Sequence, residues 1–324
     1  MDYLSLIKSP IAAELENFRT LFDQSLSTSN PLLGSVVSHI RQKNGKMMRP
    51  MLVLLAAKLY GTVCPATLHA AVSLELLHNA SLVHDDVVDE SSERRGQLSV
   101  NAIFNNKVAV LSGDYLLATA LVQVALTRNH DIVDIVSALG QDLADGELLQ
   151  LSNVSNLEFS EEVYFDVIHK KTAVLFAACT KAGALSAGAG ADEIERARRF
   201  GECIGLCFQI KDDIFDYYES KEIGKPTGND MHEGKLTLPV LRALNTTNDA
   251  EAARIAVLVK QGHASAQEIA WLVQFTKDHG GIESATQTMY SLRDEALALL
   301  SDLPDTDVKQ ALVAYLDYVV KRDK

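Results

Sequence analysis

The 324-residue chain is poor in the residues that build sheets, disulfide scaffolds and nucleic-acid surfaces. Aromatic residues make up only 6% of it, and it has 7 prolines and 4 cysteines. Lys and Arg number 30 against 43 Asp and Glu, and the net charge of -13 argues against a nucleic-acid-binding surface. No two cysteines form a C-x-x-C pair, and all four lie in apolar helical context. We therefore expect buried, reduced thiols in a cytoplasmic protein.

Signals for membrane insertion and for covalent catalysis are also missing from the sequence. The first residues show no basic stretch followed by an apolar core, and no run of about 18 apolar residues is free of polar breaks. The chain has no Ser-His-Asp order, Walker loop or dinucleotide-binding glycine pattern. We therefore expect no transmembrane segment, and a reaction in which a leaving group departs without a covalent enzyme intermediate.

Apolar residues recur at helical spacing almost throughout the chain, and no alternating strand pattern of useful length occurs. A capping box, Ser265 with Glu268, predicts the start of one late helix. No linker rich in Pro, Gly or Ser divides the chain. We predict an all-α fold in a single domain over residues 1–324, with a central cavity between helices. The clearest predicted helices cover residues 65–89, 108–127, 130–152, 160–188 and 192–218.

Two aspartate clusters of the same form follow long apolar segments. They are Asp85-Asp86-Val87-Val88-Asp89 and Asp212-Asp213-Ile214-Phe215-Asp216. On a helix, positions i and i+4 project from one face, so each cluster presents a pair of carboxylates. Four acids in a partly buried cleft would repel one another, and Mg²⁺ shared between carboxylates and substrate phosphates relieves that repulsion. The clusters therefore predict a site that holds a diphosphate through Mg²⁺.

Basic residues occur where a diphosphate would need counter-charge. Arg94 and Arg95 follow the cluster closely. Lys46 and Arg49 stand on a loop that opens a helix, and a helix N-terminus itself attracts anions. His78, on the apolar helix before the cluster, is a candidate for substrate contact, although a lone histidine there is more often a core residue.

A second group of candidate ligands belongs to the second half of the chain. Lys171 and Thr172 interrupt an apolar helical segment. Gln209 lies one turn before Asp212 and faces the same side, so its amide could bond a phosphate oxygen or a metal-bound water. A glycine-bearing stretch carries Lys225 and Lys235, which suits a lid over an anionic substrate.

Taken in this order, the motifs resemble those of the all-trans polyprenyl diphosphate synthases, which are class I isoprenoid synthases. Met47 stands where many members of that family carry a basic residue. The resemblance implies a helical bundle of the isoprenoid synthase type around a deep central cavity, usually as a homodimer. It also implies Mg²⁺-dependent, head-to-tail condensation of an allylic diphosphate with isopentenyl diphosphate. The matching segments are residues 45–50, 78–96, 171–172, 208–216 and 224–239.

The resemblance assigns roles to individual residues. The implied metal ligands are Asp85, Asp89 and Asp212, with Asp216 assisting. The implied catalytic set is Asp85, Asp86, Asp89, Lys171, Asp212 and Asp213. The implied ligands of the allylic diphosphate are Arg94, Lys171, Thr172, Gln209, Lys225 and Lys235. The implied ligands of isopentenyl diphosphate are Lys46, Arg49, His78 and Arg95.

Product length depends on the residues that line the cavity below the first cluster. Ala80 and Ser81 lie about one turn before Asp85, where members of the family with short products often place an aromatic floor. Two small residues predict an open tunnel and a long product, about C40 or longer. The alternative is a short-chain synthase making farnesyl or geranylgeranyl diphosphate.

Two further alternatives are less consistent with the motifs. A terpene cyclase would usually carry Ser or Thr and then Glu at the positions of Asp216 and Ser220. A non-catalytic partner subunit commonly loses acids from one cluster, and both clusters are complete here.

Overall fold

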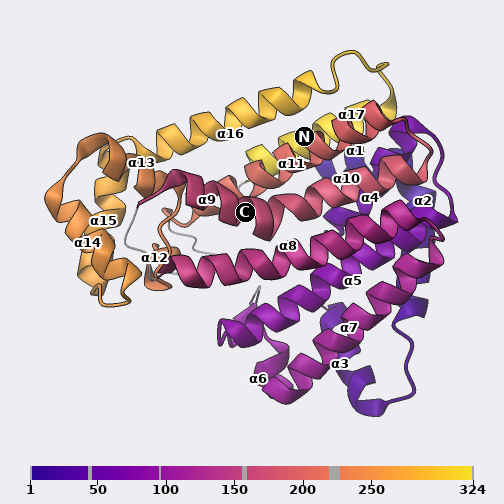
Figure 1. Ribbon diagram of the computed structural model, residues 1–324, viewed down its shortest axis with the longest axis horizontal. Helices are drawn as coiled ribbons and strands as arrows, with labels where there is room; N and C mark the ends of the chain where they lie inside the picture. Colours follow the sequence, from indigo (N-terminus) through magenta and orange to yellow (C-terminus); the bar gives the residue numbers. More distant parts are fainter. Residues whose placement is uncertain (1, 43–45, 95, 155–158, 219–226, 323–324) are drawn as a thin grey trace. The chain divides into compact units, whose positions relative to one another are not determined.

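The computed structural model describes residues 2–42, 46–94, 96–154, 159–218 and 227–322, and helices make up nearly all of its regular structure (Figure 1). The all-α prediction is confirmed. The described residues contain one small antiparallel hairpin, β1 (Glu93–Arg94) and β2 (Gln97–Leu98). A 3-10 turn covers Ser9–Ile11, and a π-helical segment covers His169–Ala173. The α-helices are α1 (Tyr3–Lys8), α2 (Ala12–Ser25), α3 (Pro31–Gln42), α4 (Met48–Tyr60), α5 (Pro65–Val88), α6 (Val100–Phe104), α7 (Asn106–Leu126), α8 (His130–Val154), α9 (Glu161–Ile168), α10 (Val174–Ser186), α11 (Ala191–Phe215), α12 (Asn229–His232), α13 (Leu238–Thr247), α14 (Ala250–Lys260), α15 (Ala266–Asp278), α16 (Gly281–Ala298) and α17 (Asp307–Lys321).

The helices group into two compact units, each assembled from several stretches of the chain. Unit 1 comprises Met1–Gln141, Leu175–Gly201 and Asp302–Tyr315. Unit 2 comprises Asp142–Val174, Glu202–Ser301 and Leu316–Lys324. The chain passes between the units within α8, at the start of α10, within α11, after α16 and within α17. The single domain and its central cavity stay predictions.

Helices α5 and α7 lie side by side in unit 1 (Figure 1). Helix α5 starts at Pro65, a residue suited to the first helical position because its nitrogen needs no partner there. Ser73 of α5 donates a 2.8 Å hydrogen bond to the Ala120 carbonyl of α7. Gly113 lets α7 pass close to α5, because a Cβ there would lie only 2.2 Å from Nε2 of His84. The end of α5, with its aspartate cluster, is therefore held firmly against α7.

The other face of α7 is apolar and exposed. Leu111, Leu121 and Val122 are 68%, 51% and 57% exposed. By length and composition, α7 is also the one helix among the described residues that could cross a membrane, a test that core helices of soluble proteins pass as well. The expectation that the chain has no transmembrane segment stays a prediction.

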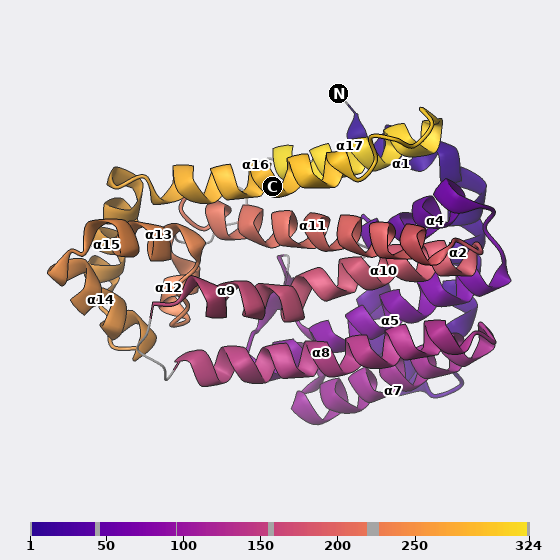
Figure 2. The ribbon, with the colours of Figure 1, turned by 45° about the horizontal axis from the view of Figure 1, so that its top comes forward.

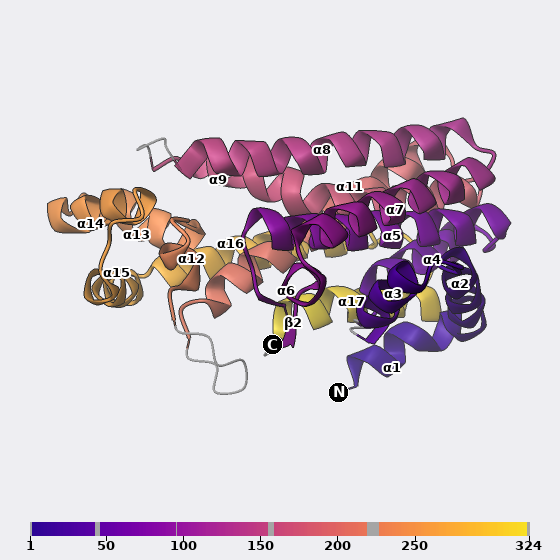
Figure 3. The ribbon, with the colours of Figure 1, turned by 90° about the horizontal axis from the view of Figure 1, so that it is seen from below.

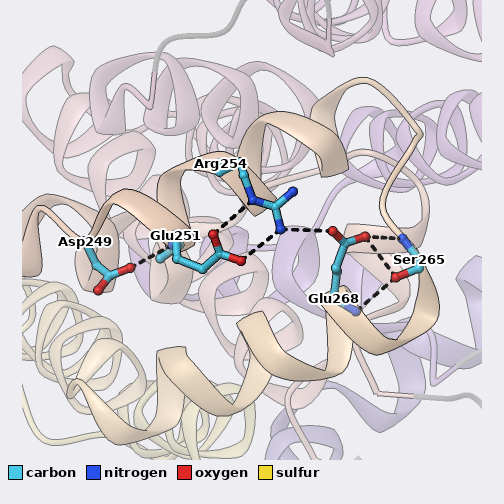
Figure 4. A network of polar contacts seen from close by, with 6 residues as sticks. Asp249, Glu251, Arg254, Ser265 and Glu268 are labelled. Carbon is cyan, nitrogen blue, oxygen red and sulfur yellow. Dashed lines mark hydrogen bonds and ion pairs between the residues drawn. The ribbon is translucent and has the colours of Figure 1, made fainter.

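In unit 2, helices α13 to α16 pack against one another and are joined by short turns (Figure 2). Arg254 of α14 links this group by donating to Glu251 on its own helix and to Glu268 of α15 (Figure 4). The predicted capping box is confirmed, because the Ser265 hydroxyl accepts from the Glu268 N–H and the Glu268 carboxylate accepts from the Ser265 N–H. Asp249 caps the N-terminal end of α14, because its side chain accepts from the Ala252 N–H.

Several helices differ from the predicted ones. Helices α3, α13 and α14 cover stretches for which no helix was predicted. The segment predicted as one helix over 160–188 is divided by the π-helical turn at His169–Ala173. In unit 1, α6 and the hairpin strand β2 follow the end of α5 (Figure 3), so the segment after the first cluster folds back beside it.

Candidate active site

The first aspartate cluster occupies the C-terminal end of α5 in unit 1. Asp85 and Asp86 lie in the last turn, and Asp89 is the C-cap residue, whose N–H donates to the Asp85 carbonyl at 2.8 Å. Asp86 is 3% exposed, whereas Asp85 is half-buried and Asp89 is exposed. The cluster thus separates into one buried acid and an accessible pair one helical turn apart.

Asp86 is compensated by the hairpin that follows it. The Arg94 Nε donates to the Asp86 carboxylate at 2.6 Å. The Asn101 side chain of α6 donates to the Asp86 carbonyl at 3.1 Å. Arg94 was predicted to bind the allylic diphosphate, and its other N–H groups can still donate to a phosphate because a guanidinium carries five donors. Arg95, predicted beside it, lies outside the described residues.

The described candidate ligands of isopentenyl diphosphate lie at the N-terminal end of α4 and on α5. Lys46 is exposed just before α4, and Arg49 lies in its first turn. The Arg49 guanidinium stacks 5.4 Å from the Phe176 ring centroid, and its Nε is buried with no hydrogen-bond partner among the described residues. His78 is 8% exposed on α5. Met47 takes a left-handed conformation, φ 53°, which turns the chain into α4.

The two residues predicted to control product length differ in their surroundings. Ala80 is 2% exposed, so its methyl group is enclosed by neighbouring atoms of unit 1. Ser81 is half-buried, and its hydroxyl donates to the His78 carbonyl at 3.0 Å. Ser81 is therefore the position at which a larger side chain can project without first disrupting a packed core.

The second cluster ends α11 in unit 2, and its leading acid has a partner that the sequence did not suggest. Arg322, near the C-terminus, places an Nη 2.5 Å from the Asp212 carboxylate. The same guanidinium stacks 4.0 Å from the Phe208 ring centroid and donates to the Phe208 carbonyl at 3.1 Å. Asp212 remains 41% exposed.

Asp213 points into unit 2 and is enclosed by hydrogen bonds. Tyr164 donates its hydroxyl to one carboxylate oxygen at 2.5 Å, and Gln209 donates to the other at 2.9 Å. Gln209 in turn accepts from the Thr172 hydroxyl at 2.9 Å. Burial raises the pKa of Asp213 to about 7, although the bonds from Tyr164 and Gln209 act in the opposite direction.

Asp216 lies just beyond α11 and organises the next turn. Its two carboxylate oxygens accept from the backbone N–H groups of Asn229 at 3.0 Å and Asp230 at 3.1 Å, at the start of α12. Asp230, which the sequence reasoning did not select, is half-buried. Desolvation of its carboxyl group and the charges of Asp213 and Asp216 raise its pKa well above the ordinary value. The nearby charge of Lys235 opposes this shift.

A pocket of about 220 Å³ in unit 2 brings the second group of candidates together. Four of the residues that line it were predicted from the sequence, namely Lys171, Gln209, Asp213 and Lys235. Residues that line it without having been predicted include Tyr164, Asp230 and Lys260. No sequence signal singled out Lys260, which is 5% exposed at the end of α14. Lys225 lies outside the described residues.

Residues 30–276 match the family model described as polyprenyl synthetase. The chain belongs to this family. It is therefore a prenyltransferase. It is 32% identical to the octaprenyl diphosphate synthase of Escherichia coli (strain K12), with 99% of each chain covered. Among solved structures, it is 62% identical to a geranylgeranyl pyrophosphate synthase from Bacteroides thetaiotaomicron, with a TM-score of 0.88 over 99% of this chain and 100% of the other. It is 30% identical to a polyprenyl synthase from Caulobacter crescentus CB15, with a TM-score of 0.92 over 99% and 98%.

The bond between Tyr164 and Asp213 predicts a stability effect. Replacing Tyr164 by Phe removes one donor from a buried carboxylate, so we expect the free energy of unfolding to fall by about 1–3 kcal/mol at neutral pH. Urea unfolding followed by circular dichroism measures this change. Tyr290→Phe is the control, because Tyr290 is 39% exposed on α16 and its variant should change stability by less than about 0.5 kcal/mol. Equal effects of the two substitutions would contradict a supporting role for Tyr164.

Proposed function

We propose that this protein condenses isopentenyl diphosphate with an allylic diphosphate, head to tail, and repeats the reaction to a long-chain all-trans polyprenyl diphosphate. One observation carries the proposal within this family. In both aspartate clusters the leading acid is accessible, whereas the acid that follows it is 3% exposed and bonded to the protein. An accessible acid can meet a metal or a substrate, and its buried neighbour holds the helix end in place.

The accessible acids are suited to Mg²⁺. We assign it to Asp85, Asp89 and Asp212, with Asp216 in support. The contact between Asp212 and a guanidinium supports this choice, because it places a cation at that carboxylate. The described residues contain no group of three or more His, Cys, Asp or Glu side chains arranged to hold a metal, so substrate phosphate oxygens and water would complete the coordination. When bound, Mg²⁺ supplies charge neutralisation for the departing pyrophosphate.

The relatives support a metal-dependent diphosphate site of this kind. The Caulobacter crescentus polyprenyl synthase was solved with calcium and isoprenyl diphosphate. For this chain we propose one site for each substrate. The proposed ligands of the allylic diphosphate are Arg94, Lys171, Thr172, Gln209, Lys225 and Lys235. The proposed ligands of isopentenyl diphosphate are Lys46, Arg49, His78 and Arg95.

The side chains act by binding, orienting and stabilising charge. Lysine and arginine groups around the allylic diphosphate stabilise the negative charge that grows on it as its bond to carbon breaks. The Thr172–Gln209–Asp213 hydrogen bonds hold Thr172 beside Lys171 in a fixed orientation. Apolar surroundings protect the allylic cation from capture by water while the isopentenyl double bond attacks. We assign the final proton to the released pyrophosphate, because no side chain in the part of the chain that the structure describes is placed as the base.

We favour a long product because positions 80 and 81 carry Ala and Ser rather than an aromatic ring. The relatives named above differ in the length of the product that their names give. The Escherichia coli relative is an octaprenyl diphosphate synthase, and the Bacteroides thetaiotaomicron relative is titled a geranylgeranyl pyrophosphate synthase. The second name keeps a shorter product as the alternative, and a sizing assay distinguishes the two.

We also propose that the enzyme is a cytoplasmic homodimer formed by one synthase domain over residues 1–324. The family match runs through both compact units, which supports a single functional domain. Three of the four thiols are buried, as expected for a reducing compartment. The exposed apolar face of α7 supports dimerisation, because monomeric soluble proteins rarely leave such a continuous apolar surface uncovered.

The catalytic proposal predicts the effect of neutralising Asp85. Purified protein is incubated with Mg²⁺, farnesyl diphosphate and labelled isopentenyl diphosphate, and the dephosphorylated products are sized by chromatography. We expect Asp85→Asn to lower turnover at least about a hundredfold with an unchanged circular dichroism spectrum. Asp134→Asn is the control, because Asp134 is an exposed acid of α8 outside both clusters. Near-normal turnover of Asp85→Asn would remove this residue from the metal site.

The product-length proposal predicts a shift in the product distribution. We expect Ser81→Phe to shorten the products, because its ring would project from the half-buried position below Asp85. Ser81→Ala is the matched control and should leave the distribution unchanged. Ala80→Phe is also expected to shorten the product, but with a loss of stability because Ala80 is enclosed. If Ser81→Phe gives the wild-type distribution, the growing chain does not pass this residue.

The dimer proposal predicts a response to charge on α7. Leu111 and Val122 lie three helical turns apart on one face. We expect the double substitution Leu111→Glu and Val122→Glu to convert a dimer into a monomer, as measured by light scattering during gel filtration. Leu32→Glu, on α3, is the control, because Leu32 is 52% exposed and lies off this face. A dimer that survives the double substitution would place the interface elsewhere.

A further inference from the structure

Helix α8 approaches the π-helical segment closely within unit 2. A Cβ added to Gly146 of α8 would lie 3.0 Å from the Lys170 Cβ and 3.0 Å from the Lys171 backbone nitrogen. Glycine at this position lets the two backbones meet without an intervening side chain. The residues next to Gly146 are thereby brought directly opposite Lys170 and Lys171.

The close approach pairs Lys171 with a carboxylate that no motif suggested. The Glu147 carboxylate lies 2.5 Å from the Lys171 ammonium. The Gln150 side chain, one turn further along α8, accepts from the same ammonium at 3.3 Å. Both charged groups are mostly shielded, with Lys171 28% and Glu147 22% exposed. Since an ammonium has three hydrogens, these two contacts leave room for one more acceptor.

The neighbouring lysine makes a pair of the same kind in a different place. Lys170 lies 2.8 Å from Asp145 and 3.5 Å from Asp166, and these acids are 62% and 50% exposed. Lys171 and Gln150 line the unit 2 pocket, whereas Lys170 and Asp145 do not. The chain therefore carries two adjacent lysine–carboxylate pairs, one at the pocket and one facing solvent.

We propose that Glu147 is a positioning residue that sets how tightly Lys171 holds a diphosphate. The inference rests on the proposed function, in which Lys171 binds the allylic diphosphate. The carboxylate orients the ammonium and also cancels part of its charge, so an incoming diphosphate meets a partly neutralised lysine. Because the pair is partly exposed, the effect on affinity is severalfold rather than a thousandfold.

This arrangement matters for an enzyme that repeats its reaction. Each condensation breaks the bond between the allylic carbon and its diphosphate oxygen, and the freed pyrophosphate must leave before the next round. A fully unpaired lysine would retain that trianionic product. Glu147 offers the ammonium an alternative partner and so favours release of pyrophosphate over its retention.

The test removes the charge of Glu147 while keeping its shape. Binding of inorganic pyrophosphate with Mg²⁺ is measured by calorimetry for the wild type and for Glu147→Gln, at two salt concentrations. We expect the substitution to lower the dissociation constant about threefold to fivefold, and to make it more sensitive to salt. In the prenyl transfer assay we expect the KM for the allylic diphosphate to fall by a similar factor, and kcat to fall because pyrophosphate leaves more slowly.

Two matched variants separate this role from a structural one. Asp145→Asn removes the solvent-facing carboxylate and should change neither the dissociation constant nor KM. Glu147→Asp keeps the charge and should return both values toward wild type, which also serves if Glu147→Gln folds poorly. An unchanged or weaker affinity for pyrophosphate in Glu147→Gln, or an equal shift in Asp145→Asn, overturns the proposal.

The binding measurement is independent of turnover. If wild-type protein binds pyrophosphate and Glu147→Gln tightens that binding, the role of Glu147 stands even where no labelled isopentenyl diphosphate is incorporated. That combination of results would count against the proposed reaction alone. Wild-type protein that incorporates isopentenyl diphosphate but shows no response to Glu147→Gln would leave the reaction in place and refute the inference.

Discussion

Negative charge at a helix end must be compensated. The C-terminal ends of α5 and α11, which carry the two aspartate clusters, both meet this constraint. Asp86 is held by Arg94, at 2.6 Å. Asp213 is held by the hydroxyl of Tyr164 and the amide of Gln209. A buried carboxylate without such partners would cost several kcal/mol. The partners therefore determine how the hairpin, α9 and α11 are placed within their own units.

Compensation differs in kind between the two clusters. In unit 1 a cation neutralises the buried acid, so Asp86 and Arg94 form a charge pair next to the accessible carboxylates. In unit 2 the described donors to the buried acid, Tyr164 and Gln209, are neutral, and burial raises the pKa of Asp213 to about 7. The cation at that cluster, Arg322, forms its ion pair with the accessible acid, Asp212.

The candidate substrate ligands depend on the same framework. Thr172 is fixed through Gln209 to Asp213, so the buried acid orients the residue next to Lys171, which lines the pocket. Lys171 is fixed from the opposite side by Glu147, which the glycine at position 146 brings within reach. Thr172 and Lys171 both belong to the π-helical turn, which therefore lies between the contacts from Gln209 and those from Glu147. Such turns are frequent at functional sites.

Local pattern was sufficient for the helical class, for the two clusters and for the capping box at Ser265, because each depends on residues within one or two turns. Neighbouring acids such as Asp212 and Asp213 look alike in a linear motif, so the sequence did not distinguish the accessible acid from the buried one. Tyr164 and Arg322 were not found because their partners are 49 and 110 positions away in the chain.

The family and its motifs were thus determined by the sequence alone. Tertiary structure decided which acids are buried, where the helix over 160–188 is broken, and how Glu147 meets Lys171. The physical reason is that compensation of charge acts through space. Contacts at 2.5–3.0 Å between residues far apart in the chain leave no local pattern from which they could be read.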